Sequence, residues 1–273
     1  MSASGECNFE IVAEILKEVA AFCDEHGICY GLIYGTLIGA VRHGDFIPWD
    51  DDADIMMSRP DYDRFCELWK KEKADSPLEL FLPLETPGYP YMIARVSDSR
   101  YPIIVDNEKP YGMGLFVDIY PFDGLGRTWI GSRLRAAAGD IMSSLCFQAA
   151  KLKFPREMFG NSAFRLVGRA AFAVSKLAGS ERLMRLIKRI PAYDYAKARY
   201  IGPLIWLTGG SRDIFPRSWF DRFVRKPLGD TEYWVPAEYD KVLRHCYGSY
   251  MELPAPENRQ GTHGYKLAKL SIK

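Results

Sequence analysis

The sequence predicts an α+β fold in which helices flank a mixed β-sheet, with a helical insertion and a C-terminal segment that packs back on the sheet. Residues 1–126 alternate between apolar residues at helical spacing and short strand-like runs, separated by Pro, Gly and Asp turns. Residues 127–200 are helical in pattern. Residues 201–273 are rich in aromatic residues and proline, which a free tail would not carry. We expect a catalytic core, a basic helical region and a C-terminal segment that completes the active site.

The expected elements can be followed along the chain. Apolar residues from Phe9 to Phe22 predict a helix that ends before Gly27. A buried strand at 28–35, a short helix from Thr36 and a second strand at 52–57 come next, and Ser58 is suited to cap the following helix. Further strands are expected at 78–82, 91–97, 101–106 and 114–120, and further helices at 132–153, 163–179 and 180–190.

The composition excludes several classes of protein. The chain has 273 residues, 48% hydrophobic and 26% charged, which is typical of a soluble globular protein. Its six cysteines form no C-x-x-C motif, which argues against a zinc knuckle or a dithiol redox site. The N-terminus lacks the pattern of a secretory signal, and no apolar run reaches the roughly 18 residues of a membrane span. We therefore expect a cytoplasmic protein.

The net charge of +1 conceals an uneven distribution. Residues 1–126 hold 10 Lys and Arg against 23 Asp and Glu, whereas residues 127–200 hold 15 against 4. The basic segment is either a solvated helical surface or a surface that docks on an anionic membrane, which would place the protein at the inner membrane face. A nucleic-acid partner is not expected because no known binding module is recognised.

Four carboxylates occupy five consecutive positions, at 50, 51, 52 and 54. If the second strand extends that far, Asp50, Asp52 and Asp54 share one of its faces. Carboxylates this close repel one another unless a cation lies among them, and a set of oxygen ligands suits Mg²⁺ or Mn²⁺. The alternative is a solvated acidic turn. That alternative does not explain the apolar residues around the cluster, which are Ile47, Trp49, Ile55, Met56 and Met57.

Two further features sharpen the metal hypothesis. Gly35 and Thr36 stand between a buried strand and a helix, where backbone N–H groups can meet a phosphate. Asp118 lies between Val117 and Ile119 in an apolar strand, and a buried carboxylate there needs a partner. A metal ion shared with Asp52 and Asp54 would supply it. This arrangement is typical of nucleotidyltransferase-fold enzymes.

Three blocks of the sequence resemble the LicD family, which includes the fukutin-related proteins. They are "YGTLIGAVRHGDFIPWDDDADIMMSRPDYDRF", "GLFVDIYPFDG" and "YGSYMELPAPENRQGTH". The resemblance covers about residues 9–123 and 213–264. It implies transfer of a phospho-alcohol from a CDP-activated donor to a glycan hydroxyl, with release of CMP. CDP-choline is the usual donor of bacterial members and CDP-ribitol that of the eukaryotic relatives. The implied acceptors are teichoic acids, lipopolysaccharide sugars or other glycans, including lipid-linked ones.

The resemblance also implies roles for individual carboxylates. Asp52, Asp54 and Asp118 are the expected catalytic residues and the ligands of Mg²⁺ or Mn²⁺. A carboxylate beside a dication is a weak base, so the ligand role of Asp118 is preferred to that of a base for the acceptor hydroxyl. Asp50 is expected to orient the cluster. Asp51 is the least secure ligand because the family pattern varies there.

Five residues are expected to contact the nucleotide donor. Gly35 and Thr36 would meet its phosphates through backbone N–H and hydroxyl groups, and Arg42 would pair with a phosphate or form a surface salt bridge. Arg259 and His263 would close over the donor. Their structural alternatives are an ion pair for Arg259 and a purely structural role for His263.

The alternatives to phosphocholine transfer stay open from the sequence. One is transfer of a nucleoside monophosphate to a small molecule. The other is an inactive protein that binds nucleotides or docks on membranes. Aromatic residues that could surround a choline group are available, although no particular cage is predicted; they are Trp49, Tyr89, Tyr91, Tyr111, Tyr120 and Trp234.

Overall fold

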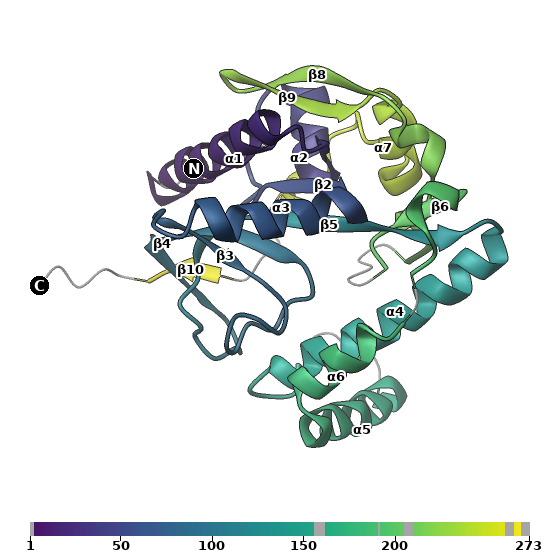
Figure 1. Ribbon diagram of the computed structural model, residues 1–273. Helices are drawn as coiled ribbons and strands as arrows, with labels where there is room; N and C mark the ends of the chain where they lie inside the picture. Colours follow the sequence, from purple (N-terminus) through teal and green to yellow (C-terminus); the bar gives the residue numbers. More distant parts are fainter. Residues whose placement is uncertain (1–2, 156–161, 191, 205–209, 260–264, 269–273) are drawn as a thin grey trace, which may run out of the picture.

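The computed structural model describes residues 3–155, 162–190, 192–204, 210–259 and 265–268. It has the predicted α+β architecture, a mixed sheet with helices on its faces (Figure 1). The main path of the sheet is β1–β2–β5–β4–β10, with β3 beside β4 and a β6–β7 pair beside the end of β5. The strands of this sheet are β1 Tyr30–Leu32, β2 Asp54–Ser58, β3 Leu78–Phe81, β4 Ala94–Val105, β5 Gly114–Gly126, β6 Tyr200–Gly202, β7 Phe215–Pro216 and β10 Tyr265–Leu267.

A separate hairpin and the helices surround this sheet. The hairpin consists of β8 Phe223–Leu228 and β9 Thr231–Pro236. The α-helices are α1 Ala3–His26, α2 Tyr34–Ile38, α3 Arg59–Glu72, α4 Trp129–Ala150, α5 Ser162–Ala178, α6 Ser180–Ile187 and α7 Tyr239–Tyr247. A π-helical turn, Gly39–His43, continues α2. Short 3₁₀ turns cover Tyr195–Lys197, Gly210–Asp213, Arg217–Phe220 and Pro256–Asn258.

Different helices pack on the two faces of the sheet at its central strands β2 and β5. On one face Arg59 of α3 donates to Asp123 of β5, and α1 and α3 pack there (Figure 1). On the opposite face the ring of Tyr120 packs against Tyr34 of α2, with centroids 5.1 Å apart. Asp118 and Tyr120 share this second face because side chains alternate along a strand. The carboxylate of Asp118 therefore lies on the side of the sheet that α2 covers, away from α1 and α3.

Most of the expected elements are confirmed, with three corrections. The runs at 91–97 and 101–106 form the single strand β4, because the chain bulges between Asp98 and Pro102 instead of turning back. The short helix begins at Tyr34, two residues before Thr36, and its first turn is closed by the Leu37 N–H donating to the Ile33 carbonyl. The second strand begins only at Asp54.

The C-terminal segment packs back on the sheet as predicted. Strand β10 pairs antiparallel with β4, and the Tyr265 hydroxyl donates to the backbone oxygen of Asp51. The helical region is joined to the sheet through the loop between β4 and β5. There the ammonium of Lys151, directly after α4, contacts buried Glu108 at 2.7 Å. Among the described helices, none is both long enough and apolar enough to cross a membrane.

We predict that the ion pair between α3 and β5 stabilises the fold. Asp123 is buried and accepts two hydrogen bonds from Arg59, at 2.7 and 2.8 Å. Asp123→Asn removes the buried counter-charge of Arg59 and leaves it only the exposed carboxylate of Asp63, 3.5 Å away, so the free energy of unfolding should fall by about 2 kcal/mol. Denaturant unfolding checks this. The matched control is Asp221→Asn, whose ion pair with Arg217 is exposed and whose loss should cost less than about 0.5 kcal/mol.

Candidate active site

Parallel pairing of β2 with β5 brings two distant carboxylates side by side. The register sets Asp54 opposite Asp118, and the pairing extends one residue further because the Asp118 N–H donates to the Ala53 carbonyl at 2.8 Å. On the other edge of β2, the Ile33 N–H donates to the carbonyl of Asp54 at 3.1 Å. Backbone hydrogen bonds on both sides therefore fix the position of Asp54.

Three buried carboxylates converge at this point. One oxygen each from Asp52, Asp54 and Asp118 lies within 4.8 Å of the others, and the residues are only 3%, 7% and 1% exposed. Burial raises the pKa of Asp54 well above its usual range, and the negative charge of Asp52 raises it further. Oδ1 of Asp54 is buried and has no hydrogen-bond partner among the described residues. An unpartnered oxygen within a set of carboxylates fits a hard divalent cation.

Arg95 of β4 is a buried cation in this cluster that the sequence analysis missed. Its Nε lies 2.5 Å from Oδ1 of Asp118, and a second guanidinium nitrogen lies 3.1 Å from Oδ2. The guanidinium lies between the rings of Tyr91 and Phe116, 3.8 and 4.0 Å from their centroids. Asp118 therefore has a protein partner in addition to any metal. A lone arginine in the apolar run "YMIARVS" was the sequence signal for it.

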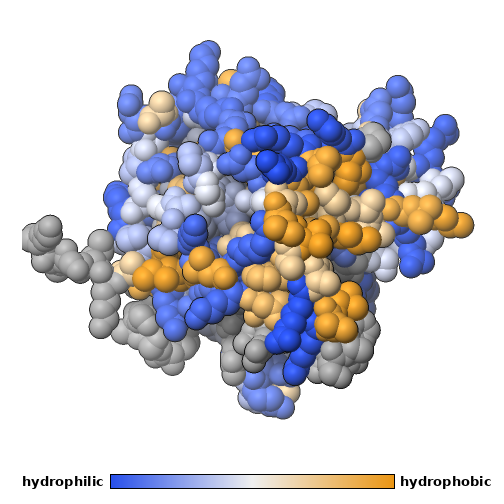
Figure 2. Space-filling model, turned by 90° about the horizontal axis from the view of Figure 1, so that it is seen from below, coloured by the Kyte–Doolittle hydropathy of each residue, from blue (hydrophilic) through white to orange (hydrophobic). Residues whose placement is uncertain are grey.

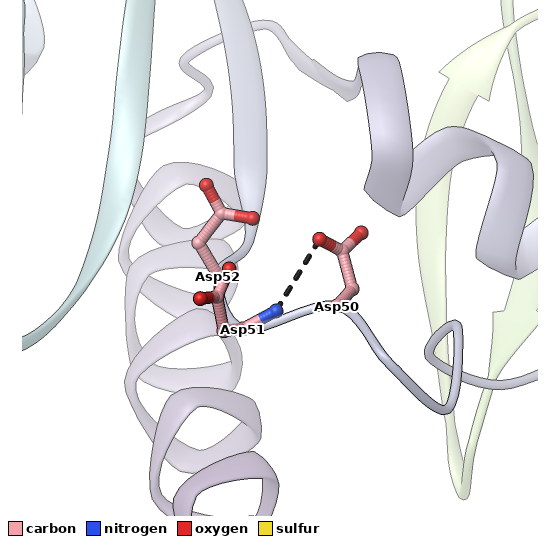
Figure 3. Close-up of side chains that lie close together, drawn as sticks. All are labelled: Asp50, Asp51 and Asp52. Atoms are coloured by element: carbon pink, nitrogen blue, oxygen red, sulfur yellow. Dashed lines mark hydrogen bonds between the residues drawn. The ribbon is translucent and has the colours of Figure 1, made fainter. Parts of the chain in front are cut away.

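The segment before β2 is irregular, so Asp50, Asp52 and Asp54 do not share a strand face as expected. The carboxylates of Asp50 and Asp52 instead rise from the same side of this loop, and the Asp51 N–H turns back to donate to Asp50 at 3.3 Å (Figure 3). Asp50, Asp51 and Asp52 also have carboxylate oxygens within 4.8 Å of one another. Asp52 thus belongs to both acidic groups.

Gly35 and Thr36 support this loop and β2 directly. A Cβ atom on Gly35 would come within 2.5 Å of Oδ2 of Asp50, so glycine allows that carboxylate to approach the helix. The hydroxyl of Thr36 is buried and accepts the N–H of Asp54 at 2.8 Å. Thr36 therefore holds the start of β2 in place. Contact of either residue with a phosphate stays a prediction.

A cavity of about 510 Å³ opens beside the acidic cluster. Asp50, Asp52 and Asp54 lie in its wall together with Gly35 and Arg42. Much of the remaining wall is aromatic, with Tyr34, Trp49, Tyr120, Tyr247 and Tyr250. The wall of the cavity thus contains both carboxylates and aromatic side chains. Of these rings the sequence analysis named Trp49 and Tyr120; the other candidates for a choline cage, Tyr89, Tyr91, Tyr111 and Trp234, do not line it.

Two of the basic residues expected at the donor site, Arg42 and Arg259, donate hydrogen bonds to backbone carbonyls. Arg42 donates to the Tyr250 carbonyl at 2.7 Å and so joins the π-helical turn to the C-terminal segment. Arg259 donates to the Pro254 carbonyl at 2.9 Å, and its guanidinium lies over the ring of Trp49, 5.5 Å from the centroid. Arg259 is thereby held next to the cavity wall. His263 lies outside the described residues.

The similarity to known proteins agrees with this geometry. Residues 27–161 match the sequence model of the LicD/FKTN/FKRP nucleotidyltransferase domain. The lipopolysaccharide cholinephosphotransferase LicD of Haemophilus influenzae is 28% identical over 261 residues, covering 93% of each chain. The chain contains a LicD-family domain. The ribitol 5-phosphate transferases FKRP of mouse and human are each 36% identical over 70 residues, or 26% of this chain and 14% of theirs.

We predict that the ionisation of Asp54 lowers the stability of the metal-free protein as the pH rises. Because the pKa of Asp54 is raised on folding, the native state holds a proton that the unfolded chain releases above about pH 4. This contribution to stability is complete below that pH and is lost as the pH rises towards the raised pKa. Asp54→Asn removes the titration. Its stability relative to the parent protein in EDTA should therefore increase between pH 5 and pH 8, as measured by denaturant unfolding.

Two comparisons make this test specific. Asp45→Asn, on an exposed residue outside the cluster, should leave the pH dependence unchanged. Added Mg²⁺ should stabilise the parent protein at pH 8 and have little effect on Asp54→Asn. Identical pH profiles for the parent and Asp54→Asn would contradict the assignment of the buried proton.

Proposed function

We propose that this protein transfers phosphocholine from CDP-choline to a hydroxyl of a cell-surface glycan or its precursor, with release of CMP. Phospho-alcohol transfer in general is supported by the LicD-family domain and by relatives named as cholinephosphate and ribitol-phosphate transferases. The observation that carries the proposal is the buried group Asp52, Asp54 and Asp118 beside a cavity of about 510 Å³, in which Oδ1 of Asp54 has no hydrogen-bond partner within the described part of the chain. Both the CDP-choline donor and the metal ion are part of what we propose.

The carboxylates fit a divalent ion, which we take to be Mg²⁺ or Mn²⁺. Asp52, Asp54 and Asp118 would hold it, and when bound it would neutralise charge on the donor diphosphate and on the departing CMP. Arg95 fixes the orientation of Asp118 by donating a hydrogen bond to each of its carboxylate oxygens. Because Asp118 is held in this way, we assign it the role of a metal ligand and not that of a general base.

The remaining residues would position the donor. Gly35 leaves room for Asp50 at the cavity wall, and the backbone of α2 lies next to it. Arg259 and Arg42 bring positive charge to the edge of a cavity that is otherwise acidic. Both are placed to meet phosphate oxygens after modest side-chain movement.

The lining of the cavity favours a cationic alcohol. Carboxylates attract a quaternary ammonium, and aromatic ring faces bind it through cation–π contacts. The rings of Trp49, Tyr120 and Tyr247 lie in the cavity wall, and the ring of Trp49 already carries the guanidinium of Arg259, 5.5 Å from its centroid. A neutral polyol such as ribitol would gain little from these rings. Choline is therefore preferred to ribitol as the transferred alcohol.

We predict that Asp52→Asn and Asp54→Asn each lower the transfer rate at least about 100-fold while the protein remains folded, because each variant loses a metal ligand and its charge. EDTA should abolish transfer and Mg²⁺ should restore it. The assay is product mass with CDP-choline and a glycan acceptor. The control is Asp51→Asn, whose carboxylate lies outside the group of Asp52, Asp54 and Asp118 and whose rate should change less than about fivefold.

The mass of the product also separates the possible reactions. Phosphocholine transfer adds a phosphocholine group to the acceptor and leaves free CMP. A product that carries the nucleoside monophosphate would identify a nucleotidyltransferase instead. Full activity of either aspartate variant, or activity in EDTA, would eliminate the metal mechanism, and faster transfer from CDP-ribitol than from CDP-choline would overturn the choice of alcohol.

A further inference from the structure

Helix α5 directs its leucine and valine side chains away from the rest of the protein, whereas half-buried Phe172 packs on Phe154 with ring centroids 5.8 Å apart. Among the residues of α5 whose burial is described, Gly168 and Ser175 are buried and the branched aliphatic residues lie on the outer side. Those outer residues are Leu166, Val167, Val174 and Leu177, which are 72%, 68%, 59% and 85% exposed. A helix on the surface of a globular protein usually buries its apolar stripe. Here the stripe of α5 is presented to the outside.

Cationic side chains border this stripe. Arg165, Arg169 and Lys176 are exposed, and residues 162–178 contain no Asp or Glu. Lys176 extends along the protein far enough to donate to the Ala149 carbonyl at 2.8 Å. The four aliphatic residues and these three cations together are called the α5 surface. It combines apolar area with one sign of charge.

Neighbouring helices add apolar area. On α4, Ile130, Leu134 and Ile141 are exposed, and so is Leu186 on α6. The view from the side of the molecule on which α5 lies shows hydrophobic side chains gathered in a broad patch with hydrophilic ones around and between them (Figure 2). Extended apolar patches of this kind mark contact with another protein or with a membrane.

We propose that the α5 surface docks on the face of an anionic lipid bilayer. The helix would lie in the plane of the interface with its aliphatic side chains among the acyl chains and its cations at the headgroups. Charge complementarity favours a bilayer over a second copy of this chain. Two copies that met through α5 would bring together two segments that each carry 15 Lys and Arg against 4 Asp and Glu.

This proposal goes beyond the transfer reaction and stands without it. None of the residues of the α5 surface lines the cavity beside the acidic cluster. Asp54→Asn should bind vesicles as the parent protein does, so failure of the catalytic proposal and failure of this one are distinguishable.

The test is cosedimentation of the full chain with two kinds of vesicle. One contains phosphatidylcholine alone, and the other contains about one third phosphatidylglycerol, which makes its surface anionic. The parent protein should bind the mixed vesicles at least tenfold more tightly than the neutral ones. Leu166→Gln with Leu177→Gln should weaken binding at least tenfold. Arg165→Gln with Arg169→Gln and Lys176→Gln should weaken it by about fivefold for each cation removed and should reduce its dependence on salt.

Matched variants guard against general effects on the surface. Ile104→Gln with Val224→Gln changes two exposed aliphatic residues elsewhere, and Arg64→Gln with Lys71→Gln and Lys241→Gln removes three exposed cations from α3 and α7. Both should bind vesicles like the parent protein. Unchanged unfolding midpoints would show that the α5 variants are folded.

Three results would overturn the proposal. One is no binding of the parent protein to the anionic vesicles. Another is equal loss of binding in the α5 variants and their controls. The third is a dimer in lipid-free sedimentation that Leu166→Gln with Leu177→Gln dissociates, since that would assign the surface to a second copy of this chain.

Discussion

The compensation of buried negative charge is the constraint on which the site depends. Asp52, Asp54 and Asp118 lie within a few ångströms of one another and are almost completely buried. Ionised carboxylates in such a place would destabilise the fold by several kcal/mol without positive partners. Arg95 supplies one positive charge, held between two aromatic rings. Oδ1 of Asp54 has no hydrogen-bond partner among the described residues, and protonation of Asp54 or a bound cation would offset the cost of its burial.

The same arrangement ties the sheet to the helical region. Tyr91 stacks on Arg95, and its hydroxyl donates to buried Glu108, which also pairs with Lys151 directly after α4. Buried charged groups need partners of fixed geometry, so this contact sets where the helical region meets the sheet. The basic helices are thereby anchored beside the catalytic core, with the exposed side of α5 left outside the contact.

The cavity owes its shape to segments far apart in the chain. The π-helical turn after α2 provides Arg42, which donates to the backbone of Tyr250, and the C-terminal segment provides Tyr247 and Pro254 in the wall. Strand β10 then pairs with β4 and places Tyr265 against the carbonyl of Asp51. The C-terminal segment thus forms part of the site and supports the acidic loop.

The sequence by itself determined the α+β class, most of the elements and the identity of the acidic residues, because these depend on local periodicity and on residue chemistry. It also indicated that Asp118 needs a cationic partner, since a carboxylate between Val117 and Ile119 implies burial. Only the tertiary structure decided that Arg95 is one such partner, because the pairing of β4 with β5 places Arg95 opposite Asp118. It likewise decided that Asp50 is held by a loop instead of a strand, that Tyr34 and Tyr247 share one cavity, and which side of α5 faces outward. These features depend on the register between strands and on the rotation of a packed helix, which contacts across the whole chain set and which no local pattern records.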